Sequence, residues 1–263
     1  MPIDGVRVYG DSGQPVLLLP GGAESCDGFF PGLREGLLAE PGCRVIEHDR
    51  PGTGTSTTAG SLTDAAAHLN ALVDELGCGP VVVVGQSLGG AVATLFARDF
   101  PDNVAGVVLL DPTPINNPDI CARLERTMGM ARRFAALPFG PRLIAALLHN
   151  ANKRTTRRLR LRPDCAAALA RTNLDFPQLA AAVHGITEIS RAMREEDLPR
   201  LPSAVVTADR KPDAAIQLAH QRLATAFGAP LLRWPGATHS VHLDHPDETL
   251  ATVRDVVAAT DRG

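Results

Sequence analysis

The residues best suited to chemistry lie around Ser87, in the segment GQSLG at positions 85–89. This segment fits the pattern G-x-S-x-G, and it lies between a four-valine run and a helical pattern. A serine on a tight strand-to-helix turn exposes its Oγ, and glycines on both sides let the strand and helix approach closely. A glycine-rich turn with a capping serine is the alternative interpretation. The strand and helix context favours Ser87 as a nucleophile.

A serine hydroxyl needs a base, usually an oriented histidine. His239, His242 and His245 all follow the last predicted strand. We predict His239 as the base, because it lies on a loop at the serine's end of the sheet, whereas His245 precedes Pro246 at a helix start. The spacing H-x-x-H-x-x-H is also compatible with a metal site. Pro246 and Gly236 interrupt any continuous helix face, however, and no catalytic zinc pattern is completed, so we expect neither metal nor cofactor.

The third member of a triad is an acid that orients the imidazole. Asp209 and Asp111 each follow a predicted strand, and both give the chain order Ser, Asp, His with Ser87 and His239. Order alone leaves both open. We predict Asp209 and keep Asp111 as the alternative acid, because Asp111-Pro112 also fits a strand-ending turn.

An oxyanion needs two fixed donors. The backbone N–H of Leu88 is one candidate. The second is the N–H of Gly22, in the segment LPGG at 19–22, because paired glycines allow the backbone to approach a substrate closely. A plain turn after a strand is the alternative interpretation of that segment.

Short apolar runs alternate with helical patterns over most of the chain, which predicts an α/β fold with a mostly parallel sheet flanked by helices. The runs at 6–9 and 15–19 flank Asp11-Ser12-Gly13 and predict a hairpin. Further strands are expected at 44–47, 81–84, 104–110, 204–207 and 230–234. Helices are expected at 62–76, 87–100, 213–227 and 247–259.

The alternation stops between Asp111 and about Leu201, where clustered prolines precede helical stretches without a good strand. We therefore predict an α/β core at 1–111 and 202–263, with an all-helical cap, or lid, inserted at 112–201. Ligands of open α/β sheets bind at the carboxyl ends of the strands, and the cap follows one of those ends.

Composition narrows the function classes. The chain has 263 residues and a net charge of −3, which indicates no general attraction to nucleic acid or an anionic membrane. Its apolar runs are too short to span a bilayer, and its first residues lack the apolar stretch of a signal peptide. Five scattered cysteines without a C-x-x-C pair indicate reduced thiols and a cytoplasmic protein. We expect a small-molecule substrate, while the oligomeric state is not indicated.

Two other segments have a structural and a functional interpretation. The loop 50–54 is interpreted as a structural turn near the site. The arginines at 154, 157, 158, 160 and 162 are interpreted as a solvated helix face, with attraction of an anionic substrate as the alternative. Phe29, Phe30 and aliphatic cap residues are expected to form an apolar pocket.

These motifs together resemble the α/β-hydrolase superfamily over essentially the whole chain except the insertion. The resemblance rests on LPGG (19–22), HDRPGTGTS (48–56), GQSLGGAVA (85–93), LLDPTP (109–114), TADR (207–210) and ATHSVHLDHPDE (237–248). It implies Ser87 as nucleophile, His239 as base, Asp209 as acid, and Gly22 and Leu88 as oxyanion donors. Pro20 and Gln86 depart from the family, in which histidine is common at both positions.

The expected function is a serine hydrolase that cleaves a carboxylic ester or related acyl bond of a small, largely apolar substrate. Lactone, thioester or carbon–carbon bond hydrolysis and cofactor-free perhydrolysis use the same triad and stay open. A non-catalytic small-molecule-binding homologue is the alternative from another class. Epoxide- or haloalkane-type chemistry is disfavoured, because Ser87 stands where members with that chemistry typically carry Asp.

Overall fold

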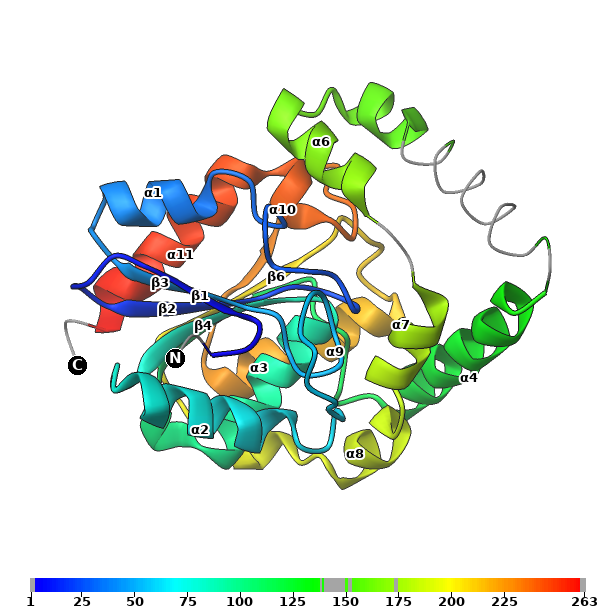
Figure 1. Cartoon of the computed structure of the whole chain (residues 1–263), viewed down its shortest axis with the longest axis horizontal. Coiled ribbons are helices and arrows are strands. Elements are labelled where there is room, and N and C mark those ends of the chain that lie inside the picture. The colour runs from blue at the N-terminus through cyan, green and yellow to red at the C-terminus, as the bar shows by residue number, and fades with distance from the viewer. Residues whose placement is uncertain (1–2, 138, 140–149, 151–152, 173–174, 261–263) are drawn as a thin grey trace.

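The structure is a computed structural model that describes residues 3–137, 139, 150, 153–172 and 175–260. Its strands are β1 (Val6–Tyr9), β2 (Pro15–Leu19), β3 (Arg44–His48), β4 (Val81–Gln86), β5 (Val104–Leu110), β6 (Ser203–Thr207) and β7 (Leu231–Arg233). Within the described residues they form one seven-stranded sheet in the order β1-β3-β2-β4-β5-β6-β7. Figure 1 shows the sheet in the middle of the molecule, with helices around it. Only β1 runs antiparallel to its neighbour. The predicted α/β class with a mostly parallel sheet is confirmed.

Helices cover both faces of this sheet. One face packs against α1 (Leu33–Ala39) and α11 (Pro246–Thr260), and the other packs against α2 (Ala65–Leu76), α3 (Leu88–Asp99) and α9 (Ala215–Phe227). In β4, Val81 and Val83 contact the second group, while Val82 and Val84 contact the first. This burial on both faces explains why the strand is a continuous valine run. It places β4 in the middle of the molecule, with β2 and β5 as neighbours.

The predicted hairpin between the first two strands is wrong. The two strands exist, but β3 lies between them and pairs with both, antiparallel to β1 and parallel to β2. Strand β2 needs partners on both edges, because its last four residues are completely buried. Strand β1 is partly exposed and suits the edge position.

Between β5 and β6, the residues that the structure describes form helices and loops without a strand. We call four of these helices the cap helices: α4 (Pro118–Ala135), α6 (Pro163–Arg171), α7 (Phe176–Ala182) and α8 (Ile186–Ala192). Helix α4 packs against α7 and α8, and α6 packs against α10 (Val241–Asp244), a short helix of the core (Figure 1). This arrangement fits the predicted helical insertion at 112–201, whose limits as a domain remain a prediction.

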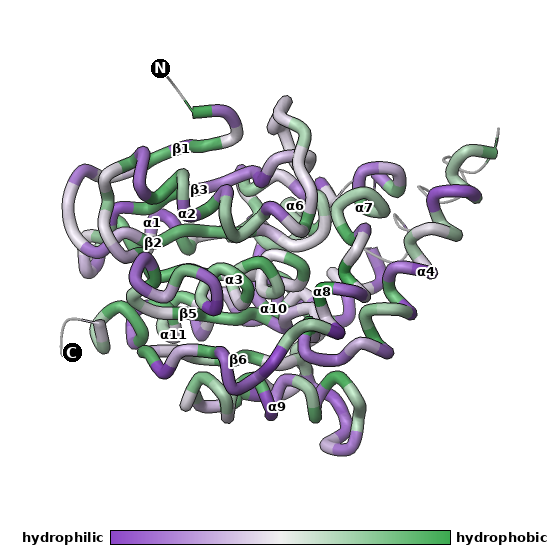
Figure 2. The backbone as a smooth tube through the Cα atoms, turned by 90° about the horizontal axis from the view of Figure 1, so that it is seen from below, coloured by the Kyte–Doolittle hydropathy of each residue, from purple (hydrophilic) through white to green (hydrophobic). Residues whose placement is uncertain are grey.

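The hydropathy of the backbone follows this layering. In Figure 2, β2, β5 and α3 are mostly hydrophobic, whereas α4 alternates between hydrophilic and hydrophobic residues along its length. No helix in the described part of the chain is long and apolar enough to cross a membrane. All five cysteines are free thiols, and four of them are buried. The cytoplasmic location stays a prediction.

Candidate active site

Ser87 lies at the turn between β4 and α3, as the sequence predicts. Its φ is 49° and its ψ −116°, a backbone conformation that non-glycine residues rarely adopt. The Ser87 N–H donates to the Leu110 carbonyl at 3.1 Å, and the Ser87 carbonyl accepts from Thr113 N at 2.8 Å. These bonds join the turn to the end of β5, so the strained conformation is held by the neighbouring strand.

The glycines around Ser87 allow three segments to meet. A Cβ on Gly89 would lie 2.3 Å from the Leu19 carbonyl oxygen, and one on Gly85 would lie 2.4 Å from the Gly89 carbonyl oxygen. Both distances are far below van der Waals contact. The end of β2 and the first turn of α3 therefore approach closely because these positions carry no side chain.

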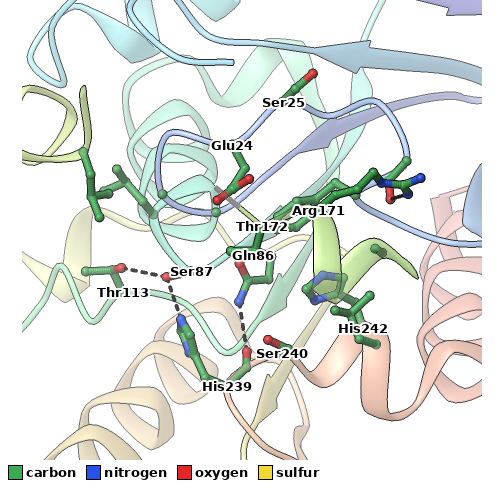
Figure 3. A pocket seen from close by; sticks show the side chains of 18 of the residues that line it. Glu24, Ser25, Gln86, Ser87, Thr113, Arg171, Thr172, His239, Ser240 and His242 are labelled. Atoms are coloured by element: carbon green, nitrogen blue, oxygen red, sulfur yellow. Dashed lines mark hydrogen bonds between the residues drawn. The ribbon is translucent and has the colours of Figure 1, made fainter. Parts of the chain in front are cut away.

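His239 lies on the loop between β7 and α10, and its ring reaches the serine. Its Nε2 is 2.9 Å from Ser87 Oγ (Figure 3). The side chain of Gln86 donates to the His239 carbonyl at 2.9 Å, which ties the histidine loop to the residue before Ser87. The sequence prediction that brings Ser87 and His239 together matches this geometry.

The acid beside His239 is Asp111, and the expectation that Asp209 pairs with His239 is wrong in this structure. His239 Nδ1 is 2.6 Å from Asp111 Oδ2. Strands β4 and β5 pair with Gln86 opposite Leu110, so Ser87 and Asp111 each stand one residue beyond neighbouring strand ends. Asp111 has a φ of 46°, also in the left-handed region. The alternative acid of the sequence analysis is therefore the one in position to orient the imidazole.

Asp209 lies two residues beyond the end of β6, and its side chain serves the loop instead. Its Oδ2 accepts from Gly236 N at 2.9 Å, and its Oδ1 is 3.7 Å from Arg233 Nε. Its backbone N–H donates to the Ala237 carbonyl at 2.8 Å. Asp209 thus supports the loop that carries His239 without contacting the ring.

Asp111 is completely buried and carries a negative charge. Burial alone would raise its pKa, but hydrogen bonds from Arg210 and His239, together with their positive charges, hold the pKa of Asp111 well below its usual range. The Ala208 N–H adds a further hydrogen bond at 2.9 Å. The carboxylate therefore stays ionised and can only accept hydrogen bonds from the imidazole.

Gly22 and Leu88, the residues of the two predicted oxyanion donors, both line the cavity at Ser87. Leu88 is the first residue of α3, so its N–H has no carbonyl of the same helix to bond. Gly22 has a φ of 52°, and a Cβ there would have only a Leu179 methyl nearby, at 3.4 Å.

Arg50 holds the Gly22 loop from behind. Its Nη1 donates to the Pro20 carbonyl at 2.7 Å and its Nη2 to the Gly22 carbonyl at 2.6 Å. The guanidinium is buried, and burial lowers the pKa of Arg50 to about 10, so it stays charged near neutral pH. The structural interpretation of loop 50–54 is supported, and the structure adds that this loop fixes the candidate oxyanion donor.

The three histidines at 239, 242 and 245 have different surroundings. His242 is 4% exposed and stacks on Phe29 with ring centroids 4.6 Å apart. Burial lowers the pKa of His242 to about 3, so it is neutral near pH 7. His245 Nδ1 lies 3.3 Å from Glu248 Oε1 at the start of α11. Among the described residues, no cluster of histidine, cysteine and acidic side chains is arranged to hold a metal ion.

The cavity at Ser87 has a volume of about 310 Å³. Its apolar lining comes largely from the cap segment, namely Leu124, Met128, Leu179 and Val183. Its polar lining includes Glu24, Asp27, Arg171, Ser240 and His242. In Figure 3, Arg171, Ser240 and His242 lie on the opposite side of Ser87 from Thr113. The cavity thus combines apolar and hydrogen-bonding surfaces around one hydroxyl group.

The remaining pocket predictions have mixed outcomes. Phe29 lines the cavity, but Phe30 does not and packs instead against the His242 ring at 5.3 Å between centroids. The arginines at 154, 157, 158, 160 and 162 are exposed, and none of them lines the cavity. Arg162 pairs with Asp164 and Asp247, each at 2.7 Å. These placements support the interpretation as a solvated face.

Sequence reasoning missed Arg210 and Thr113. Arg210 forms a two-point ion pair with Asp111, and Thr113 Oγ1 is 3.5 Å from Ser87 Oγ. In the structure, Asp111 is the first residue after β5, as Ser87 is after β4, whereas Asp209 is the second after β6. The expected strand at 81–84 ends two residues before β4 does, so the sequence did not show these offsets. Equal offsets from neighbouring parallel strands bring side chains together at the sheet edge.

Known proteins are similar to this chain in sequence. A family model described as the alpha/beta hydrolase family matches residues 16–252. The lipase LipV of Mycobacterium tuberculosis is 41% identical over 109 residues, which are 41% of this chain and 41% of that protein. A 2-hydroxy-6-oxononadienedioate/2-hydroxy-6-oxononatrienedioate hydrolase of Comamonas testosteroni is 32% identical over 111 residues, covering 40% and 38%. These matches span about two fifths of the length of the curated relatives.

Solved structures extend the likeness to the whole fold. A thermophilic esterase from Thermogutta terrifontis matches with a TM-score of 0.72 and 25% identity, covering 97% of this chain and 93% of that chain. The predicted fold and the resemblance described from the motifs are confirmed by the family match and by this structure.

Proposed function

Because this chain belongs to the alpha/beta hydrolase family, we propose that it is a serine hydrolase that cleaves a carboxylic ester or a related acyl bond of a small substrate. The observation that carries the proposal is the hydrogen-bonded series Ser87 Oγ, His239 and Asp111, with contacts of 2.9 and 2.6 Å. A lipase and an esterase among the similar proteins support the same class of reaction.

In the proposed mechanism, His239 Nε2 takes the Ser87 proton while Oγ attacks the substrate carbonyl carbon. The N–H groups of Gly22 and Leu88 stabilise the oxyanion of the tetrahedral intermediate. His239 then protonates the leaving group, which departs and leaves an acyl group on Ser87. Water, activated by the same imidazole, releases the acid and restores the hydroxyl. Asp111 orients the ring and stabilises its cation throughout, without taking a proton.

The lining of the cavity supports a narrower substrate class. The side chains of Leu124, Met128 and Leu179 suit an apolar acyl group. The polar lining carries both signs of charge together with the neutral His242 imidazole, which suits hydroxyl or carbonyl groups better than a single strong charge. We therefore expect esters with a short apolar acyl chain to be turned over best.

The experiment is a turnover screen of p-nitrophenyl esters, lactones and acyl thioesters, combined with labelling by a fluorophosphonate. Wild type should be labelled at one site, and Ser87→Ala should lose both labelling and turnover. Ser240→Ala is the matched control, because Ser240 lines the same cavity and should keep its labelling.

Two outcomes of this experiment would separate the candidate functions. Turnover of thioesters or lactones in preference to simple esters would change the substrate and keep the mechanism. The name of the Comamonas testosteroni relative supports adding 2-hydroxy-6-oxononadienedioate to the screen. Folded wild type that neither reacts with the fluorophosphonate nor turns over any substrate would refute catalysis and favour a small-molecule-binding protein.

A further inference from the structure

The Asp111 carboxylate has a second charged partner besides His239. Its Oδ2 accepts from Arg210 Nη2 at 2.5 Å and from His239 Nδ1 at 2.6 Å. Its Oδ1 accepts from Arg210 Nη1 and, at 2.9 Å, from Ala208 N. The guanidinium fork and the imidazole therefore approach the same buried carboxylate, and one oxygen serves both.

Arg210 is itself held in place. Its Nη1 lies 3.3 Å from Thr207 Oγ1 at the end of β6, and its side chain is only 22% exposed. The other titratable group near the carboxylate is His220 of α9, whose Nδ1 is 3.8 Å from Asp111 Oδ1. Burial lowers the pKa of His220, so it is neutral near pH 7. Arg210 is thus the cation at Asp111 that keeps its charge throughout the reaction, whereas His239 gains and loses a proton in each cycle.

We propose that Arg210 is a positioning residue for the reaction, which fixes the plane of the Asp111 carboxylate so that Oδ2 meets His239 Nδ1. The two parallel hydrogen bonds of a guanidinium set both the direction and the rotation of a carboxylate, which a single donor cannot do. The backbone supports this role, because Asp111 has a positive φ and its N–H is bonded to the Val206 carbonyl at 2.8 Å. This inference rests on the proposed function of Ser87, His239 and Asp111.

A second consequence concerns charge. The guanidinium stabilises the ionised carboxylate, and it also opposes the positive charge that His239 gains when it accepts the Ser87 proton. Removing the cation should make the coupled His239–Asp111 pair hold a proton more tightly. The acid limb of the kcat/KM profile should therefore move to higher pH in a variant without Arg210. A residue with only a structural role would leave that limb in place.

The test compares wild type, Arg210→Ala, Arg210→Lys and the control Arg222→Ala with p-nitrophenyl butyrate as substrate. Arg222 is the matched control, because its ion pair with Glu195 lies away from Asp111. Arg210→Ala should lose about tenfold to a hundredfold in kcat with little change in KM, because the misplaced base affects the chemical step. Its acid limb should move up by about half a pH unit or more. Millimolar guanidinium chloride should restore part of the lost activity, whereas sodium chloride should not.

Arg210→Lys keeps the charge but loses the fork, so it should keep the wild-type acid limb and lose part of kcat. If chemical denaturation shows that Arg210→Ala does not fold, the comparison of Arg210→Lys with wild type is the test. If wild type is active and the Arg210 variants have the same kcat and acid limb as wild type, the role of Arg210 is refuted and the proposed function stands. Inactive wild type would refute the proposed function and this inference with it.

Discussion

At the residue scale, the candidate site is built from two turns of the same kind on neighbouring strands. Ser87 and Asp111 both follow a buried strand by one residue, and both have a positive φ near 50°. Such conformations cost about 1–3 kcal/mol each, so the surrounding bonds must enforce them. The Ser87–Leu110 and Asp111–Val206 backbone bonds do so across β4, β5 and β6. The carboxylate and the hydroxyl are therefore fixed relative to each other by the sheet.

This geometry gives a direct test of the acid. Asp111→Asn should lower kcat by about 10⁴-fold, because an amide favours the wrong imidazole tautomer in a triad of this type. Asp209→Asn is the control and should leave kcat little changed, because the Asp209 carboxylate bonds Gly236 N instead of the ring. The measurement is steady-state kinetics on folded protein, checked by denaturant unfolding. A larger loss in Asp209→Asn than in Asp111→Asn would reverse the assignment.

The sequence analysis placed Ser87 and His239 together but preferred Asp209 to Asp111, and the difference has a physical reason. Ser87 is part of a motif whose local strand-turn-helix geometry is encoded in neighbouring residues. The choice between Asp111 and Asp209 depends on where the strands end. Asp111 is the first residue after β5, whereas Asp209 is the second after β6 and its side chain bonds the loop. Arg210 then occupies the space beside Asp111. Such a distinction needs the strand register, which no short motif contains.

At the element scale, the positions of the strands and of most helices along the chain could be predicted. The order in which the strands pair in the sheet could not. The four-valine run, the strand at 104–110 and the helix ending at Gly77 all appear close to their expected limits. The hairpin was predicted because two apolar runs around a turn favour local pairing. In the structure, β2 is paired on both edges, and β3 lies between β1 and β2. Sheet order is a property of the whole core.

The close contact between β2 and α3 is the element-scale feature that a mutation can test. Gly89→Ala would place a Cβ 2.3 Å from the Leu19 carbonyl oxygen, so it should lower the free energy of unfolding by about 1–3 kcal/mol. It should also lower activity, because the same contact positions Leu88 and Gly22. Gly129→Ala on α4 is the control, since a Cβ there meets nothing within 4 Å. That variant should gain about 0.5–1 kcal/mol, because alanine favours a helix interior over glycine.

Chemical denaturation of both glycine variants measures these changes, and p-nitrophenyl butyrate turnover measures activity. Equal stability of Gly89→Ala and wild type would show that the two segments can separate without cost. The close approach would then be no requirement of the fold.

At the scale of the whole molecule, buried neutral histidines should set the acid side of the stability curve. Burial lowers the pKa values of His48 and His242 to about 3 each, whereas in the unfolded chain histidine titrates near 6.5. Their contribution is therefore complete above about pH 6.5 and is lost as the pH falls towards 3. Each group should cost about 1.4 kcal/mol of stability per pH unit within that window.

His242→Phe tests this expectation, because phenylalanine fits beside Phe29 and Phe30 and does not titrate. Between pH 7 and 5, the variant should lose about 2 kcal/mol less stability than wild type. His245→Gln is the control for removing an imidazole from a site that is only partly buried. Parallel stability curves for wild type and His242→Phe, from urea unfolding across this range, would contradict the expectation.

The position of Asp111 also bears on chimeric proteins in which inserted helices are exchanged between relatives. The chain leaves the sheet at this residue, yet Pro112 O is bonded by His220 at 2.7 Å and Thr113 N by the Ser87 carbonyl at 2.8 Å. Ile115 N in turn donates to Thr113 O at 2.7 Å. A donor segment spliced in directly after strand β5 would replace these anchors. Crossover points placed beyond Ile115 would keep the acid and its neighbours native, so new cap sequences could be recombined without rebuilding the reaction centre.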